Sequence, residues 1–138
     1  MLYLFIDIAG DELKFGDEIE CGVFVIDSLT KTVKLSVRSR ELLETLEEKE
    51  LRMSHQSEGC TWHPEFGNWM IESTPSRPYS NYASDLLRVE RNMVLRRRRL
   101  LSALRSDEIA PYVRHPPPHC YINYLYSHAL SSYSCAYR

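Results

Sequence analysis

Two glutamates at the beginning of an apolar run are the first residues in this sequence that could carry out chemistry. In the stretch FGDEIECGVFVID, Glu18 and Glu20 precede residues that are apolar on both faces of the expected strand. Side chains two residues apart on a strand point the same way, about 7 Å apart. The strand is therefore expected to be core along its middle and to present two carboxylates on one face at its end.

A second pair of glutamates flanks an expected tight turn. Gly67 and Asn68 favour a turn within the stretch CTWHPEFGNWMIESTP, which reads as a hairpin. If the turn is centred on residues 68 and 69, Glu65 and Glu72 face each other about 5 Å apart. Two carboxylates at that distance repel by about 3 kcal/mol at an effective dielectric constant near 20, unless a proton or a cation offsets the repulsion.

A cluster made only of carboxylates has the chemistry of a hard-cation site. Mg²⁺ or Mn²⁺ fits such oxygen ligands, whereas zinc without a histidine or cysteine ligand does not. The candidate metal ligands are Glu18, Glu20, Glu65 and Glu72. Spacing alone favours the plainer alternative, in which strand-end and hairpin glutamates point into solvent.

Other side chains with reactive groups give weaker signals. The four arginines 96–99 spread about 300° around a helix and cannot form one patch, so a solvated helix face with ion pairs is favoured over contact with nucleotide or nucleic acid. His63 could orient a ligand carboxylate, although an ordinary strand histidine is favoured. Four residues near the C-terminus are types that bind zinc: His115, His119, Cys120 and His128. Their spacing matches no common zinc module.

The elements that must position the glutamates follow from hydrophobic periodicity. Alternation predicts a strand from residue 18 to about 26 with a hairpin partner at 32–37, and a second hairpin at 60–75. Apolar residues at helical spacing predict helices over 40–51 and 85–105. The pattern is typical of an α+β fold with an antiparallel sheet and helices.

Bulk composition excludes several classes of protein. The chain has 138 residues, a net charge of −2 and a hydrophobic fraction of 43%, which predict one soluble domain with neither a nucleic-acid nor a membrane partner. No apolar run approaches the ~20 residues of a membrane span, and the N-terminus lacks the basic region of a signal peptide. The four cysteines form no CxxC pair, which favours free thiols and a cytoplasmic location.

The C-terminal segment differs from the rest of the chain. Residues 111–138 hold six of the nine tyrosines, few charges and no steady period. We therefore expect a domain over residues 1–110, followed by a disordered tail over 111–138.

Four blocks in a fixed order carry a family resemblance: FGDEIE, LLETLEEKE, WHPEFGNWMIESTPSRPY and VERNMVLRRRR. Their order and spacing resemble the N-terminal part of the eukaryotic-type glutamate–cysteine ligase catalytic subunit (γ-glutamylcysteine synthetase). That family shows WGDExEY, then PEYGxYMxExTPxxPY, then VExNM followed by a basic run. The resemblance covers residues 13–104.

The resemblance implies a glutamine-synthetase-like ligase fold with a sheet curved into a funnel. It implies that ATP phosphorylates the γ-carboxylate of L-glutamate, and that L-cysteine then attacks to give γ-glutamylcysteine, the first step of glutathione biosynthesis. Mg²⁺ (or Mn²⁺) is the implied cofactor, ATP is a substrate, and a regulatory subunit is a potential partner. The metal-binding glutamates of the family match Glu18, Glu20, Glu65 and Glu72.

Departures from the family pattern limit what this chain is expected to do. Phe15, Cys21 and Phe66 replace aromatic residues of the family motifs, and the resemblance stops after Arg105. Family members continue for several hundred residues, which supply the arginines that grip ATP and glutamate. We expect one metal-binding wall of a ligase in a truncated chain that is not active alone. The alternative is a non-catalytic remnant or binding module that keeps the metal-site strands and the basic helix.

Overall fold

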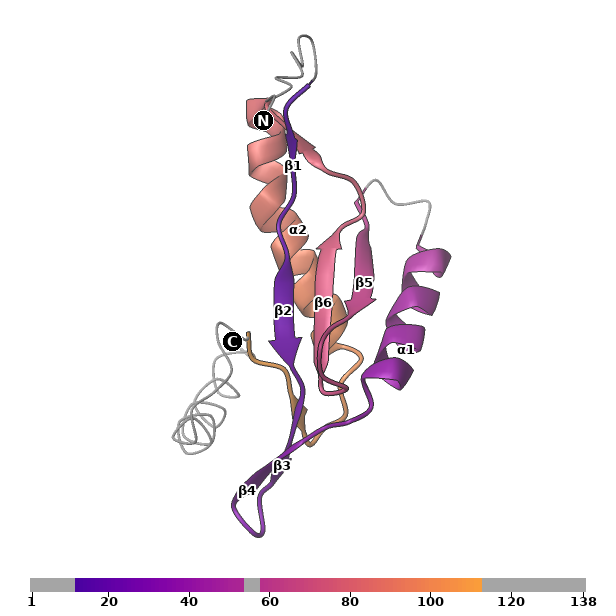
Figure 1. Cartoon of the computed structure of the whole chain (residues 1–138), viewed down its shortest axis with the longest axis vertical. Helices are drawn as coiled ribbons and strands as arrows, with labels where there is room; N and C mark the ends of the chain where they lie inside the picture. The colour runs from indigo at the N-terminus through magenta and orange to yellow at the C-terminus, as the bar shows by residue number, and fades with distance from the viewer. Residues whose placement is uncertain (1–11, 54–57, 113–138) are drawn as a thin grey trace, which may run out of the picture.

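The computed structural model describes residues 12–53 and 58–112, which form short antiparallel sheets and two helices (Figure 1). The elements in chain order are β1 (Lys14–Phe15), β2 (Ile19–Gly22), β3 (Phe24–Asp27), β4 (Thr32–Leu35), α1 (Ser39–Arg52), β5 (Cys60–Pro64), β6 (Met70–Pro75), β7 (Tyr79–Ser80), α2 (Ala83–Leu101) and β8 (Glu108–Ile109). The predicted α+β class is confirmed. None of the helices in the described part of the chain is long and apolar enough to cross a membrane.

Three antiparallel sheets organise the described residues. The central sheet has the order β2-β6-β5, a second sheet has the order β4-β3-β8, and β1 pairs with β7. Figure 1 shows α2 running behind the central sheet and α1 lying beside β5. One face of the central sheet therefore carries the helices, and the opposite face is left without a helix.

Alternation along the central strands places apolar side chains on the helix-covered face. The core contains Ile19 and Cys21 of β2, Cys60 and Trp62 of β5, and Ile71 of β6, packed against Leu42 and Leu46 of α1 and Leu100 of α2. Because successive side chains of a strand point to opposite faces, the intervening residues of the same strands lie on the uncovered face. Burial of the core thus determines which residues form the candidate site.

The predicted strand over residues 18–26 is interrupted at Val23. Its backbone N–H donates to the Trp69 carbonyl at 2.7 Å, and its carbonyl accepts from the Ser36 N–H at 3.0 Å. Val23 is only 1% exposed. The chain passes here from the central sheet to the β4-β3-β8 sheet, so the apolar character of both faces marks a junction between sheets.

The predicted orientation of residues 32–37 is wrong. The alternation predicts that Val33, Leu35 and Val37 face the core, yet Leu35 is 52% exposed and Val37 is 74% exposed, while Ser36 is buried. The Ser36 hydroxyl donates to the Glu108 carboxylate at 2.7 Å. A buried carboxylate needs hydrogen-bond donors, and this requirement outweighs the burial of Leu35, at the end of a short edge strand, and of Val37, just beyond it.

Both predicted helices are present, with bounds shifted by a few residues. The interpretation of the arginine run as a solvated face is wrong for two of its members, since Arg96 is 1% exposed and Arg99 is 6% exposed. The expected ion pairs do form: Arg96 pairs with Asp17, and Arg99 pairs with Glu50. The arginines therefore tie α2 to the rest of the fold.

Candidate metal centre

A histidine and two glutamates form a row across the three strands of the central sheet. Glu20 of β2 pairs directly with Glu72 of β6, and Glu72 pairs in turn with His63 of β5. All three belong to the face opposite the core residues. The strand register thus brings together side chains that are far apart in the sequence.

The hydrogen-bond alternation places Glu20 and Glu72 at the closer of the two antiparallel spacings. Gly22, which pairs with Met70, turns its N–H away from β6 to the Pro111 carbonyl, and Val23, the next residue, donates its N–H to the Trp69 carbonyl. Directly opposed residues alternate between hydrogen-bonded and non-hydrogen-bonded pairs, so Glu20 and Glu72 form a non-hydrogen-bonded pair. The Cα atoms of such pairs lie about 4.5 Å apart, with the side chains adjacent.

The predicted opposition of Glu65 and Glu72 is wrong, although the turn lies where it is predicted. The Met70 N–H donates to the Gly67 carbonyl at 2.8 Å, which closes a turn centred on residues 68 and 69. Strand pairing, however, ends at Pro64 opposite Ile71, so residues 65 and 66 loop out between strand and turn. Proline has no N–H to donate to a ladder, which explains why pairing stops there.

The other three predicted glutamates nevertheless act on Glu72. The pKa of Glu72 is raised, first by partial burial and then by the negative charge of Glu18, with smaller contributions from Glu65 and Glu20. His63 acts in the opposite direction on the same carboxyl. The candidate ligands therefore share one region of negative potential, with Glu72 at its centre.

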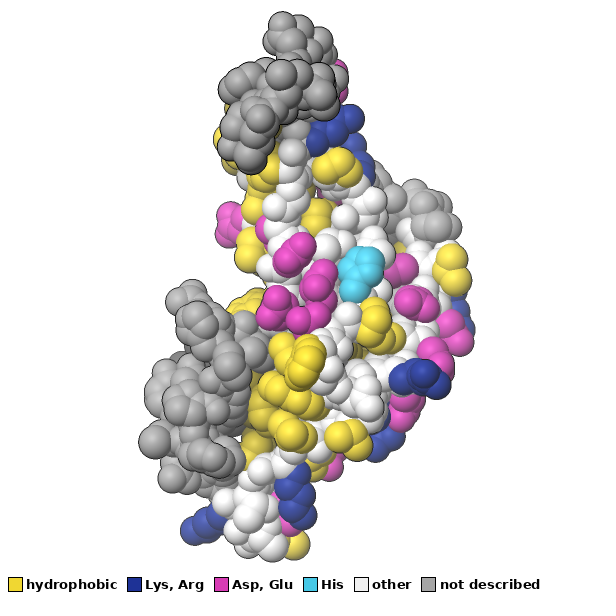
Figure 2. Space-filling model, viewed as in Figure 1, with side chains coloured by type: hydrophobic (Ala, Val, Ile, Leu, Met, Phe, Trp, Pro, Cys, Tyr) yellow, Lys and Arg dark blue, Asp and Glu magenta, His cyan; other side chains and the backbone are white. Residues whose placement is uncertain are grey.

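The acidic cluster lies on the uncovered face. Glu18 is exposed, and Glu20, Glu65 and Glu72 are half-buried. Figure 2 shows acidic side chains gathered beside a histidine near the middle of this face, above a group of apolar side chains. A ligand arriving from solvent reaches these carboxylates without any displacement of a helix.

The donor set fits a hard divalent cation in its chemistry. Carboxylate oxygens are the ligands that Mg²⁺ and Mn²⁺ prefer. Within residues 12–53 and 58–112, no three acidic, histidine or cysteine side chains converge closely enough to hold a metal ion as they stand. Each glutamate has three side-chain torsions, so rotamer changes can move its carboxylate while the backbone stays fixed.

His63 is a member of this face that sequence reasoning did not favour. Its Nε2 lies 3.3 Å from the Thr74 hydroxyl of β6. The sequence does place His63 two residues before Glu65, and so on the same face of a continuous strand. It does not show that residues 65 and 66 loop out, which is why His63 rather than Glu65 lies opposite Glu72.

The two described cysteines, Cys21 and Cys60, are free and buried. Burial raises the pKa of the Cys21 thiol to about 11, and burial together with Glu50 raises that of Cys60 to about 12. A thiol must ionise to act as a nucleophile or a metal ligand. These cysteines are therefore core residues, which leaves the carboxylates as the candidate ligands. The predicted zinc-type residues near the C-terminus lie outside the described residues.

Replacement of Glu72 by glutamine is expected to stabilise the metal-free chain at pH 7 by about 0.5 kcal/mol, because like charges directly opposed on strands are destabilising by such amounts. A carboxyl whose folded pKa is raised contributes stability below its unfolded pKa and loses it as pH rises through the folded value. The gain should therefore vanish in acid, below the ordinary pKa of 4.5. Urea denaturation at pH 7 measures the gain in stability, and at pH 3.5 it measures the disappearance of that gain. A lower stability of the variant than of wild type at pH 7 would contradict the repulsion.

Comparison with known proteins identifies the family. The family described as glutamate-cysteine ligase matches residues 4–130. The glutamate–cysteine ligase catalytic subunit of Homo sapiens is 39% identical over 98 residues, which cover 71% of this chain and 15% of the relative. The catalytic subunit of Mus musculus is 39% identical over 94 residues, covering 68% and 15%. The glutamate–cysteine ligase of Candida albicans is 35% identical over 89 residues, covering 63% and 13%.

These relatives are several times longer than the present chain, which spans about 15% of the length of the human and mouse proteins. The matched residues 4–130 contain the three strands, β2, β5 and β6, that build the acidic face. On these matches, the chain belongs to the glutamate–cysteine ligase family.

Proposed function

We propose that this chain forms one metal-binding wall of an ATP-dependent ligase that joins the γ-carboxylate of L-glutamate to L-cysteine. The observation that supports this most directly is the pairing of Glu20 with Glu72 on neighbouring strands. The pKa of Glu72 is raised by partial burial and then by the charges of Glu18, Glu65 and Glu20. Carboxylates that lie close together on one face repel one another and destabilise the fold unless a cation or a proton offsets their charge. The names of the relatives supply the ligase chemistry for the proposal.

In this proposal, Glu18, Glu20, Glu65 and Glu72 hold Mg²⁺ (or Mn²⁺), which would neutralise charge on the phosphates of ATP during phosphoryl transfer. The contribution of this chain is to position the carboxylates that would bind the metal. Glu20 and Glu72 lie on paired strands whose opposite faces are buried in the core, so their backbones are fixed before any ligand arrives. A fixed backbone limits where the carboxylate oxygens can lie, which suits the nearly octahedral coordination of Mg²⁺.

Further parts of the proposal concern the whole ligase. A glutamine-synthetase-like funnel, binding of both amino acids and contact with a regulatory subunit would require the residues that the longer relatives have beyond the matched region. We propose a cytoplasmic location, in keeping with the free thiols of Cys21 and Cys60. The chain alone is expected to bind metal without turnover.

A chimera tests the function. Residues 13–104 of this chain would replace the matched region of the human catalytic subunit, and ATP-dependent formation of γ-glutamylcysteine would be measured. We expect an active chimera whose kcat/KM falls at least 100-fold when Glu72 becomes glutamine, because the change removes a carboxylate ligand. Glu47→Gln, an exposed change on α1, is the matched control. A folded but inactive chimera would favour the alternative of a non-catalytic binding module.

A further inference from the structure

A buried arginine lies directly beneath the acidic face. Arg96 of α2 is 1% exposed and lies among core-facing residues of the two glutamate-bearing strands, including Ile19, Ile71 and Ser73. It is therefore on the opposite side of the central sheet from the carboxylates. From there its guanidinium can reach the backbone of the sheet and no ligand on the far face.

The contacts of Arg96 join the two segments that carry the candidate ligands. Its Nη1 donates to the Ser73 carbonyl at 2.6 Å and to the Asp17 carbonyl at 3.4 Å, and its Nη2 forms an ion pair with the Asp17 carboxylate. Ser73 follows Glu72 directly, and Asp17 directly precedes Glu18. One guanidinium thus contacts the backbone of both glutamate-bearing segments, at the same end of the acidic row.

This connection matters because strand pairing does not extend far enough to fix Glu18. The ladder between β2 and β6 begins at Ile19 opposite Ser73, and residues 16–18 lie outside any strand. The contacts of Asp17 with Arg96 therefore link this segment to Ser73 of β6 beyond the end of the ladder. Tyr79 lies close to the same carboxylate, since burial and Asp17 raise the pKa of its hydroxyl to about 12.

We infer that Arg96 and Asp17 are positioning residues for the metal centre: acting through the backbone, they set the placement of Glu18 and Glu20 relative to Glu72. This inference rests on the proposed function for its metal. Arginine suits the task because its planar fork can bind several acceptors at once in fixed directions. A lysine at the same position keeps the charge but presents a single ammonium group, and cannot span Ser73 and Asp17 in the same way.

The test uses the 138-residue chain with Mn²⁺ alone as the probe. We compare wild type with Arg96→Lys and with Arg38→Lys, a control that perturbs an ion pair with Glu108 far from the acidic row. Asp17→Asn is the second variant, in case Arg96→Lys does not fold. Changes in groups that orient metal ligands typically lower affinity 10–100-fold. We expect a loss of that size in Arg96→Lys or Asp17→Asn, and less than a twofold change in Arg38→Lys.

Equal Mn²⁺ affinity of wild type and a folded Arg96→Lys or Asp17→Asn variant would overturn the inference. An equal loss in Arg38→Lys would also overturn it, because the effect would then follow general destabilisation. Hydrogen exchange at the Ile19 amide gives a readout that does not depend on metal. If wild type binds no Mn²⁺, the proposed metal centre is wrong, and the exchange measurement then decides the positioning role alone. Unchanged protection of the Ile19 amide in Arg96→Lys and Asp17→Asn would overturn that role. A loss of protection in these two variants, and not in Arg38→Lys, would support it.

Discussion

Replacement of Glu50 by alanine is expected to lower the free energy of unfolding by about 4 kcal/mol. The Glu50 carboxylate, near the end of α1, forms an ion pair with buried Arg99 and accepts from the Cys60 N–H and the Trp62 indole N–H, each at 3.3 Å. Breaking a buried ion pair by removing one of its members is destabilising by about 3–5 kcal/mol. The alanine variant also leaves two further buried donors without their acceptor.

Urea denaturation monitored by tryptophan fluorescence measures this effect, since Trp62 lies at the contact. The matched control is Glu47→Ala, which changes an exposed residue of the same helix that makes no hydrogen bond or ion pair among the described residues. Exposed substitutions of this kind change stability by no more than about 0.5 kcal/mol. A loss below 1 kcal/mol in Glu50→Ala would show that the carboxylate does not anchor α1 to α2 and β5.

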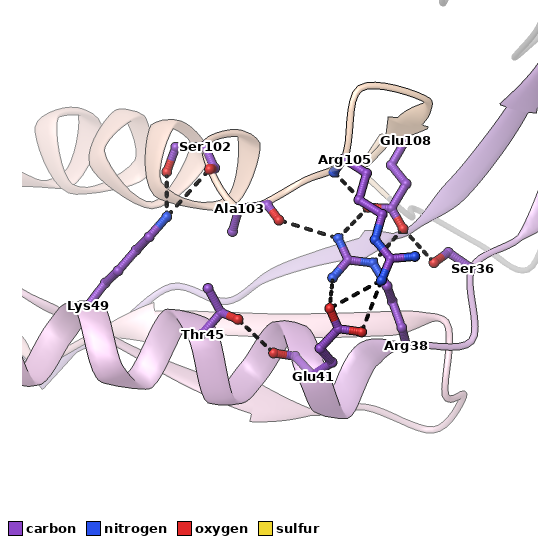
Figure 3. Close-up of polar contacts among 9 residues, drawn as sticks. All are labelled: Ser36, Arg38, Glu41, Thr45, Lys49, Ser102, Ala103, Arg105 and Glu108. Atoms are coloured by element: carbon purple, nitrogen blue, oxygen red, sulfur yellow. Dashed lines mark hydrogen bonds and ion pairs between the residues drawn. The ribbon is translucent and has the colours of Figure 1, made fainter.

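Replacement of Glu108 by glutamine is expected to destabilise the fold by about 3 kcal/mol. Figure 3 shows the Glu108 carboxylate at the centre of a network that joins β8, α1 and the end of α2. It accepts from Arg38 Nε at 2.7 Å, the Ser36 hydroxyl at 2.7 Å and the Arg105 N–H at 2.9 Å. Chiefly because of the Arg38 hydrogen bond, its pKa falls from 4.5 to about 2. That difference corresponds to about 3 kcal/mol.

The same network predicts a pH dependence with a definite sign. A carboxyl whose folded pKa is lowered contributes stability above its unfolded pKa, and the contribution is lost as pH falls through the folded value. Wild type should therefore lose about 3 kcal/mol between pH 4.5 and pH 2 through Glu108. Urea denaturation across this range should show a shallower decline in Glu108→Gln than in an exposed control, Glu44→Gln. Parallel declines in the two variants would contradict the assignment.

Much of the candidate site follows from local sequence pattern. Two-residue periodicity separates Glu20 from its buried neighbour Cys21, and in the structure the burial of Cys21 and Ile71 turns Glu20 and Glu72 away from the core. The turn at residues 68 and 69 is also predictable from Gly67 and Asn68. The pairing partner of Glu72 is not predictable from the sequence, because the looped-out residues 65 and 66 shift the register so that His63 lies opposite Glu72.

The contacts beneath the site depend on partners that are distant in sequence. In the sequence, Arg96 is one of four consecutive arginines in a predicted helix, and arginine side chains are usually exposed. Its burial requires the Asp17 carboxylate, 79 residues away. The interruption at Val23 is similar, because it depends on backbone contacts with Trp69 and Ser36 that no local pattern encodes.

Calorimetric titration of the 138-residue chain with Mn²⁺ tests the central claim most directly, that the acidic face of the central sheet is a metal centre. The double variant Glu20→Gln, Glu72→Gln removes the directly opposed pair, and Glu44→Gln, Glu47→Gln removes two exposed carboxylates of α1 as the matched control. We predict saturable binding to wild type and control, and its loss in the first variant. A folded wild-type chain without saturable binding, or a first variant that binds as tightly as wild type, would contradict the claim.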